Sequence, residues 1–364
     1  MTTEEIKTLI LSLKNTLGVN KILLTGGEPL LNPDIVDIVQ LLTTLHIKSD
    51  LVTNGKLLSY DLIHKLENAG LKRIRISIDG VGEEHSKYRI WSNVYELWNK
   101  CKYIKENTRI NTVVHTVSSS HNANIMFDIY KRVLEVRADR WRVFDVGYEG
   151  SANRNIRDLN IANYYNEFMC QMAKIIEHYI KNNLIKNLDM EINGVFKTNL
   201  LTNPLKFMKK EDQKTYLNSI KRSSPCAYIQ HQSTIRSNGI GTLCQFFHND
   251  LYNYRKFDFN VKKTLENKKN FDENKIVFDD IRHCKDCKYA IICNSGCRSK
   301  AKYLTNDINN PDPVFCVLLP LLYEKIVPIF PEDSRKNFIS FLNEGGKDPL
   351  FNAKDLSLMI ENKY

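Results

Sequence analysis

Hydrophobic positions in the first half of the chain recur with two alternating periods. In residues 2–17 they fall on one face of a helix, at Ile6, Leu9, Ile10, Leu13 and Leu17. Residues 21–25 (KILLT) follow as a short apolar run, which is typical of a buried parallel strand. The same alternation predicts further strands at residues 49–53, 72–78, 110–117 and 140–146. It predicts further helices at residues 33–46, 59–69, 91–107, 122–137 and 160–183. Strand–helix units that repeat in this way indicate parallel strands with right-handed crossovers, in a barrel or in a doubly wound sheet.

The second half of the chain lacks this alternation. Residues 185–222 are polar and rich in lysine and asparagine, which suggests a partly helical crossover, and residues 250–275 form a charged insertion. The last segment has the pattern of helices that either dock back or stay exposed. We therefore expect four parts: a barrel (1–184), a crossover linker (185–222), a cysteine-rich domain (223–320) and a helical tail (321–364).

Composition narrows the class of protein. A length of 364 residues, with 42% hydrophobic and 26% charged positions, fits a water-soluble protein with one large and one smaller domain. No apolar run is long enough to span a membrane. The formal net charge of +10 raises the question of nucleic-acid binding, but the basic residues are interspersed with acids, as in KKEDQK. This pattern favours a solvated lysine-rich surface, and it is compatible with an anionic peptide substrate.

Three loops that follow successive predicted strands carry candidate binding residues. They are residues 25–29 (TGGEP), 53–55 (TNG) and 77–80 (SIDG). Ligands of parallel α/β folds bind at the carboxyl ends of the strands, where these loops meet. Two glycines let the backbone approach a ligand closely, and Glu28 can hold an ammonium group. Each motif alone also fits an ordinary turn.

Four cysteines with the spacing C-x2-C-x5-C-x3-C lie within residues 284–297. Thiolates repel one another, so either a cation gathers them or they are oxidised in pairs. The chain begins MTTEEIKTLI, without an apolar signal-peptide core. We therefore expect a reducing cytoplasm, where stable disulfides are disfavoured. The spacing alone leaves zinc and iron–sulfur clusters open, although a four-cysteine zinc site usually has two well-separated C-x2-C pairs.

The surrounding cysteines extend this pattern. Cys226, Gly239 and Cys244 form C-x12-G-x4-C upstream, and Cys316 follows downstream. The whole string resembles the SPASM extension of radical S-adenosylmethionine enzymes. The motifs GGEP, TNG and SIDG, in that order, resemble the partial barrel of the same family. The resemblance implies an α/β fold, a partial (β/α)6 TIM-like barrel lacking its first strand, with a small cysteine-rich C-terminal domain.

The resemblance also implies cofactors and their ligands. Two auxiliary [4Fe–4S] clusters are expected, one held by Cys284, Cys287, Cys293 and Cys316. The other would be held by Cys226, Cys244 and Cys297, with its fourth position open or filled by a residue that the sequence does not identify. S-adenosylmethionine would contact Gly26, Gly27, Glu28 and Pro29 through its amino group, and Asn54, Ser77 and Asp79 near its ribose and carboxylate. Arg89 is either a carboxylate partner or an exposed helix-cap residue.

One family feature is absent from this sequence. The C-x3-C-x2-C loop that holds the catalytic cluster does not occur, and Cys101 and Cys170 fall in helical patterns as buried small residues. Two accounts compete: a truncated chain whose complete form carries that loop, or a natural relative that binds without radical chemistry. Without a preceding strand, residues 21–25 would form an unpaired apolar edge, which favours truncation.

The family's chemistry suggests a peptide or protein maturase that crosslinks or oxidises its substrate by hydrogen abstraction. In the truncated form it would be inactive. An electron donor such as flavodoxin or ferredoxin would be a partner, whereas no nucleic acid or membrane is expected. The first alternative is an iron–sulfur binding or electron-relay protein. The second resembles anaerobic sulfatase-maturing enzymes, but Gln245 stands where those have an aspartate, and glutamine is a poor base. A zinc-stabilised nucleic-acid-binding protein is a third alternative.

Overall fold

The structure of the protein is a computed structural model. It describes residues 1–86, 89, 92–147, 155, 161–192, 196–197, 209–221, 233–246, 250–267 and 276–362.

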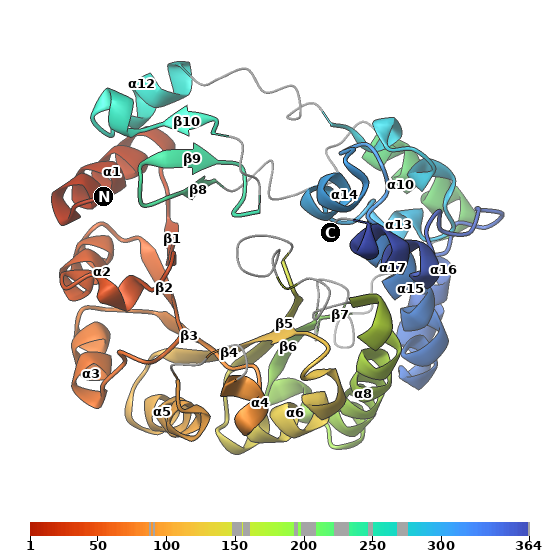
Figure 1. Ribbon diagram of the computed structural model, residues 1–364, viewed down its shortest axis with the longest axis horizontal. Helices are drawn as coiled ribbons and strands as arrows, with labels where there is room; N and C mark the ends of the chain where they lie inside the picture. The colour runs from red at the N-terminus through yellow and green to blue at the C-terminus, as the bar shows by residue number, and fades with distance from the viewer. Residues whose placement is uncertain are drawn as a thin grey trace.

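A curved sheet of parallel strands forms the first half of the molecule. Its strands are β1 (Lys21–Leu24), β2 (Lys48–Thr53), β3 (Arg73–Ser77), β4 (Asn111–Ser118), β5 (Arg140–Asp145), β6 (Asp189–Ile192) and β7 (Phe196–Lys197). They lie side by side in sequence order; β1 to β6 are parallel, and β7 is antiparallel to β6. A doubly wound sheet would reverse its strand order at a switch point. The uninterrupted order therefore identifies the wall of a partial barrel, as Figure 1 shows.

The sheet contains one more parallel strand than the sequence pattern predicted. We expected residues 185–222 to form a crossover, but they include β6. Met190 and Ile192 of this strand are buried. The alternate positions are acidic, and both pair with arginines of β5: Arg140 Nε donates to Asp189 Oδ2 at 2.7 Å, and Arg142 Nε lies 2.8 Å from Glu191 Oε2. Because Asp189 and Glu191 are acidic, the sequence of this strand resembles that of an exposed loop.

Helices cover the outer face of the sheet. They are α1 (Thr3–Leu17), α2 (Ile35–Thr44), α3 (Tyr60–Asn68), α4 (Glu83–Ser86), α5 (Val94–Asn107), α6 (Met126–Glu135) and α8 (Ile161–Lys181). Strand residues that face them, such as Leu51, Ile74 and Trp141, are fully buried and form the main core. Thr2 begins α1 with a capping box that includes Glu5, so the predicted N-terminal helix has its own start signal.

The strand β1 is an edge of the sheet. Among the described residues it pairs with β2 alone, and Leu23 is 40% exposed. The predicted apolar edge at residues 21–25 is therefore present. Unpaired N–H and C=O groups along such an edge are free to bond to a further strand.

The second half of the chain closes the arrangement into a ring. Its elements are α10 (Lys210–Lys221), β8 (Thr234–Ile235), β9 (Ile240–Thr242), β10 (Tyr252–Asn253), α12 (Val261–Glu266), α13 (Ala290–Cys293), α14 (Arg298–Thr305), α15 (Pro313–Lys325), α16 (Glu332–Ser340) and α17 (Ala353–Glu361). Short 3-10 turns lie at η1 (Pro29–Leu31), η2 (Ala123–Ile125), η3 (Leu184–Lys186), η4 (Arg255–Phe257), η6 (Phe278–Asp280), η7 (Cys284–Asp286) and η8 (Val327–Ile329).

Both ends of this region contact the barrel (Figure 1). At one end α12 packs on α1, where Val261 N–H donates to Ser12 Oγ at 2.8 Å and Leu9 joins a cluster with Tyr254 and Phe259. At the other end α15 and α17 pack on α8. Within the described part of the chain, no helix is both long and apolar enough to cross a membrane.

Candidate functional site

The loop after β1 is tied to the loop after β2 by Glu28. Its carboxylate accepts hydrogen bonds from Thr53 Oγ1 at 2.7 Å, from Asn54 N–H at 2.8 Å and from Leu30 N–H at 3.2 Å. A carboxylate has about four acceptor positions, so about one remains for an external donor. The sequence placed Glu28 and Asn54 separately near one ligand, and the structure brings these two residues together.

The two glycines of this loop leave its surface open. Gly26 has φ of 148°, a backbone conformation that residues other than glycine rarely adopt. A Cβ at Gly26 or Gly27 would meet nothing within 4 Å. Pro29 begins the short turn η1. A ligand could therefore approach the backbone of this loop directly.

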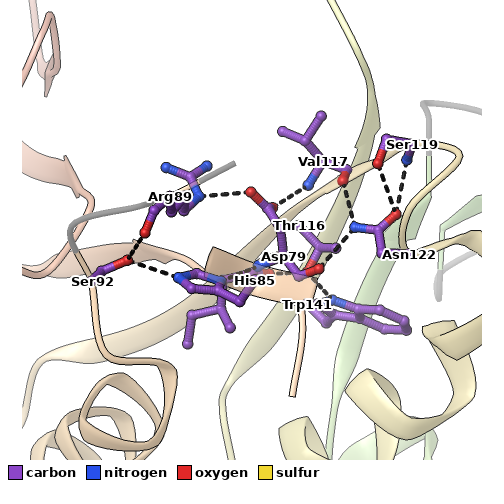
Figure 2. Close-up of polar contacts among 10 residues, drawn as sticks. Asp79, His85, Arg89, Ser92, Thr116, Val117, Ser119, Asn122 and Trp141 are labelled. Atoms are coloured by element: carbon purple, nitrogen blue, oxygen red, sulfur yellow. Dashed lines mark hydrogen bonds and ion pairs between the residues drawn. The ribbon is translucent and has the colours of Figure 1, made fainter. Parts of the chain in front are cut away.

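The loop after β3 is held by Asp79, which is 4% exposed. One carboxylate oxygen accepts Val117 N–H at 2.8 Å, and the other accepts Arg89 Nε at 2.6 Å, as Figure 2 shows. Arg89 is thus not an exposed helix cap, since it is paired with Asp79. Ser77 is the last residue of β3, in register with His115 of β4. The sequence indicated Asp79 and Arg89 separately and gave no sign of their pairing.

His85 and Asn122 fix the same loop and were not predicted. Asp79 N–H donates to His85 Nδ1 at 3.1 Å, which leaves the ring proton on Nε2, 2.8 Å from Ser92 Oγ (Figure 2). Burial lowers the pKa of His85, in keeping with a neutral ring. Asn122 Nδ2 donates at 2.9 Å to the carbonyls of Asp79 and Val117. In the sequence, His85 lies in HSKYR, with three residues between it and Arg89. This motif pointed to Arg89 and not to His85.

Charged residues line the inner face of the sheet. Arg75 of β3 pairs with buried Asp50 of β2, and Arg142 pairs with Glu191. Between them lies His115, in register with Arg142 and with its ring 5.2 Å from that of Phe144. Burial, followed by the nearby arginines, lowers the pKa of His115 to about 3. The inner wall is therefore polar and contains a neutral histidine, which hydrophobic periodicity could not reveal.

Four predicted cluster ligands line one partly open cavity. Cys284 comes from η7, Cys287 follows it, Cys293 ends α13 and Cys316 lies in the first turn of α15. Burial raises the pKa of the Cys284 and Cys316 thiols to about 12. Burial, and then the Cys284 and Cys316 charges, raise the pKa of Cys293 well above its ordinary value.

These thiols fit the chemistry of an iron–sulfur cluster. Four thiols with raised pKa values become thiolates together only beside a strongly cationic group. A [4Fe–4S] cluster takes four cysteine thiolates, and the lining of the cavity supplies four. The thiols are not arranged around a single metal ion, since among the described residues no three cysteine, histidine, aspartate or glutamate side chains form such a group.

The second predicted ligand set is partly described. Cys226 lies outside the described residues. Cys244 follows β9, and Cys297 begins α14. Their segments adjoin because Ser299 Oγ donates to the Phe246 carbonyl at 2.8 Å. The glycine of C-x12-G-x4-C, Gly239, has φ of 82° in the turn between β8 and β9, and this conformation accounts for glycine at that position.

The C-terminal tail docks back onto the four-thiol cavity. Lys288 N–H donates to the Lys347 carbonyl at 2.8 Å, and Lys347 N–H donates to the Asp286 carbonyl at 2.7 Å. Pro349 and Leu350 line the cavity, and the backbone N–H of the next residue, Phe351, partly opposes the rise that burial causes in the pKa of Cys316. The sequence left docking and exposure of the tail open, and it gave no sign that the tail covers the cysteines.

A partial barrel of parallel strands with loops at its strand ends, together with a thiol-lined cavity, defines an α/β fold with a cysteine-rich addition. Residues 1–133 match the family model described as the Radical SAM superfamily. The chain therefore contains a radical SAM domain.

Some relatives match a short part of this chain at higher identity, and others match most of it at lower identity. GTP 3',8-cyclase of Crocosphaera subtropica is 43% identical over 104 residues, which are 26% of this chain and 31% of the relative. The chain thus spans about a third of the length of the first relatives that it matches. AdoMet-dependent heme synthase of Methanosarcina barkeri is 24% identical, with 88% of each chain covered. PqqA peptide cyclase of Bradyrhizobium diazoefficiens is 23% identical over 88% of this chain and 79% of the relative.

Solved structures share the fold across most of the chain. Native anSMEcpe with bound AdoMet and Cp18Cys peptide has a TM-score of 0.67 and 18% identity, over 93% of this chain and 91% of that chain. SuiB of Streptococcus suis bound to S-adenosylmethionine has a TM-score of 0.58 and 16% identity, over 86% and 70% respectively. The expected α/β fold of a radical SAM partial barrel with a cysteine-rich C-terminal region is confirmed.

Proposed function

We propose that this chain is the barrel and cysteine-rich region of a radical S-adenosylmethionine enzyme that modifies a peptide or protein by hydrogen abstraction. The observation that carries the proposal is the cavity lined by four thiols in a chain with a radical SAM domain. Two neighbours in fold, anSMEcpe and SuiB, have structures with a bound Cp18Cys peptide and a bound precursor peptide SuiA, respectively.

In this proposal the strand-end loops bind S-adenosylmethionine, which supplies the radical chemistry. The backbone of Gly26, Gly27 and Pro29 and the carboxylate of Glu28 receive its amino group. Asn54 and Ser77 lie beside its ribose. Asp79 acts by holding Arg89, whose guanidinium faces the carboxylate of the ligand. The Nε–H of Arg89 is used by Asp79, and the remaining N–H groups of the guanidinium are suited to bidentate binding.

The cysteine-rich region would hold two auxiliary [4Fe–4S] clusters. Cys284, Cys287, Cys293 and Cys316 form one site, and Cys226, Cys244 and Cys297 form the other. The clusters would exchange electrons with the substrate and with a donor of the flavodoxin or ferredoxin type, in the cytoplasm.

The catalytic cluster requires a C-x3-C-x2-C loop, which this sequence does not contain. The free edge of β1, with Leu23 exposed, offers the place where a strand that carries such a loop would pair. Our second candidate is an iron–sulfur electron-relay protein without that loop. That role would need the cavity lined by four thiols but no C-x3-C-x2-C loop.

The experiment begins with the DNA upstream of the first codon. If an in-frame segment encodes C-x3-C-x2-C, the extended protein is reduced anaerobically with S-adenosylmethionine and with peptides encoded nearby. We expect release of 5'-deoxyadenosine and a loss of two hydrogens from the peptide. A porphyrin substrate is assayed in parallel because of the heme synthase relative. Turnover of the porphyrin alone would contradict the peptide proposal, and absence of the segment would leave the electron-relay candidate.

A further inference from the structure

Asp312 lies at the junction of the two predicted ligand sets and is 1% exposed. Its carboxylate Oδ2 accepts Cys297 N–H at 2.8 Å, while Oδ1 accepts Val314 N–H at 2.9 Å. Its backbone carbonyl accepts Cys316 N–H at 3.1 Å. The carboxylate of Asp312 thus holds the main chain of Cys297, assigned to one cluster, and caps the helix whose first turn carries Cys316, assigned to the other.

Asp312 also sets where two helices begin. It is the N-cap of α15, whose first turn carries Cys316, and it contacts Cys297, the N-cap of α14. In addition, Asp312 lines the four-thiol cavity. A shift of this carboxylate would therefore move the starts of both helices relative to the cavity.

The chain before Cys297 is shaped to admit the aspartate. Gly296 has φ of 70°, and a Cβ at this glycine would lie 2.6 Å from Asp312 Cβ. Any larger residue at this position would push Asp312 away. The two segments can therefore approach this closely only because residue 296 is a glycine.

Nearby basic groups offset part of the free-energy cost of burying the Asp312 carboxylate. Fully buried Arg298 donates to the carbonyls of Ile308 and Asn310 at 2.7 Å, in the segment that precedes Asp312. Burial raises the pKa of Asp312, and the charges of Lys300 and Arg298 offset only part of that rise. A carboxylate without these partners would be costly to bury, since its desolvation is large.

We propose that Asp312 is a positioning residue that couples the two cluster sites, so that they form and are lost as one unit. This inference rests on the proposed presence of two clusters. It assigns to one side chain the coupling between them.

The test uses this full chain reconstituted anaerobically with iron and sulfide. Asp312→Asn keeps one acceptor oxygen but turns an amide group toward the other N–H. We expect altered electron paramagnetic resonance signals and shifted midpoint potentials for both clusters. We also expect roughly tenfold faster iron loss to a chelator from both sites, a size typical of residues that orient metal ligands.

Two further variants separate positioning from general stability. Gly296→Ala displaces Asp312 without removing it and should also perturb both signals, so it tests the coupling if Asp312→Asn does not fold. Val314→Ala keeps its N–H and removes buried carbon atoms, so it should lower the unfolding temperature while both signals remain as in the wild type.

Each outcome discriminates. A wild-type chain that binds no clusters would reject the proposed function itself. A wild-type chain with two clusters, together with variants of Asp312 and Gly296 that leave either signal unchanged, would overturn the coupling. Equal effects of Val314→Ala and Asp312→Asn on both signals would likewise reduce Asp312 to a general contribution to stability.

Discussion

Lys300 of α14 donates a hydrogen bond to Asp145 at the end of β5, with 2.6 Å between Nζ and Oδ2. The two side chains are 16% and 3% exposed. This buried ion pair joins the cysteine-rich region to the carboxyl edge of the sheet, where the strand-end loops lie. It therefore fixes the cysteine-rich region against the barrel, three residues after Cys297.

Replacement of Lys300 by methionine should remove the ammonium group that faces the buried carboxylate of Asp145. We expect the free energy of unfolding to fall by about 3–5 kcal/mol, as for other buried pairs that lose one member. Urea denaturation measures this change. The control is Lys131→Met, which removes an exposed pair with Asp128 and should change stability by less than about 1 kcal/mol. Equal losses in the two variants would refute a special role for the Lys300–Asp145 pair.

Glu28→Gln should weaken binding of S-adenosylmethionine. The substitution removes the charge that organises Thr53 and Asn54 and that would receive the ligand's ammonium group. Loss of such a charge-assisted bond is worth about tenfold or more in affinity. Isothermal titration calorimetry of the reconstituted chain measures the affinity. Glu135→Gln, which neutralises a side chain that is 57% exposed on α6, is the control. Unchanged binding in Glu28→Gln would count against the proposed ligand site.

His115 should make stability depend on pH. Its pKa falls from 6.5 to about 3 on folding, mainly through burial. Between these values the unfolded chain binds a proton that the folded chain does not, so stability decreases as the pH falls below 6.5. The slope from one group is at most about 1.4 kcal/mol per pH unit.

His115→Gln should flatten that slope between pH 6.5 and about pH 3, the range over which the pKa shift acts. Urea denaturation at a series of pH values gives the slope. His46→Asn, at an exposed position, should retain the wild-type slope. A wild-type slope in His115→Gln would show that His115 is not the group responsible.

Gly346→Ala should loosen the tail from the four-thiol cavity. A Cβ at this position would lie 2.7 Å from both Cα and N of Lys288, backbone atoms that cannot give way easily. We expect faster bleaching of the reconstituted cluster by a chelator, followed by visible absorbance. Gly27→Ala, where a Cβ meets nothing within 4 Å, is the control. Identical bleaching rates in the two variants would mean that the tail does not protect the site.

Sequence patterns predicted what is local in the chain. The strands β1 to β5 were predicted from their apolar runs. The strand β6 was missed because Asp189 and Glu191 are typical of an exposed segment, and their pairing with Arg140 and Arg142 is a tertiary contact. Pairing between strands far apart in sequence cannot be read from periodicity.

The same limit applies to the site. Cysteine spacing predicted four residues that do line one cavity, because several of them are close in sequence. The pairing of Asp79 with Arg89, the junction at Asp312 and the tail over Cys316 depend on tertiary contacts. A single aspartate in NNPDPVFC gave no reason to select it.

The most direct measurement is anaerobic reconstitution of this chain, with determination of iron, sulfide and zinc and a Mössbauer spectrum. The account predicts a brown protein with about eight iron atoms per chain, in two [4Fe–4S] clusters. A colourless protein with a single zinc ion and no bound sulfide would contradict it.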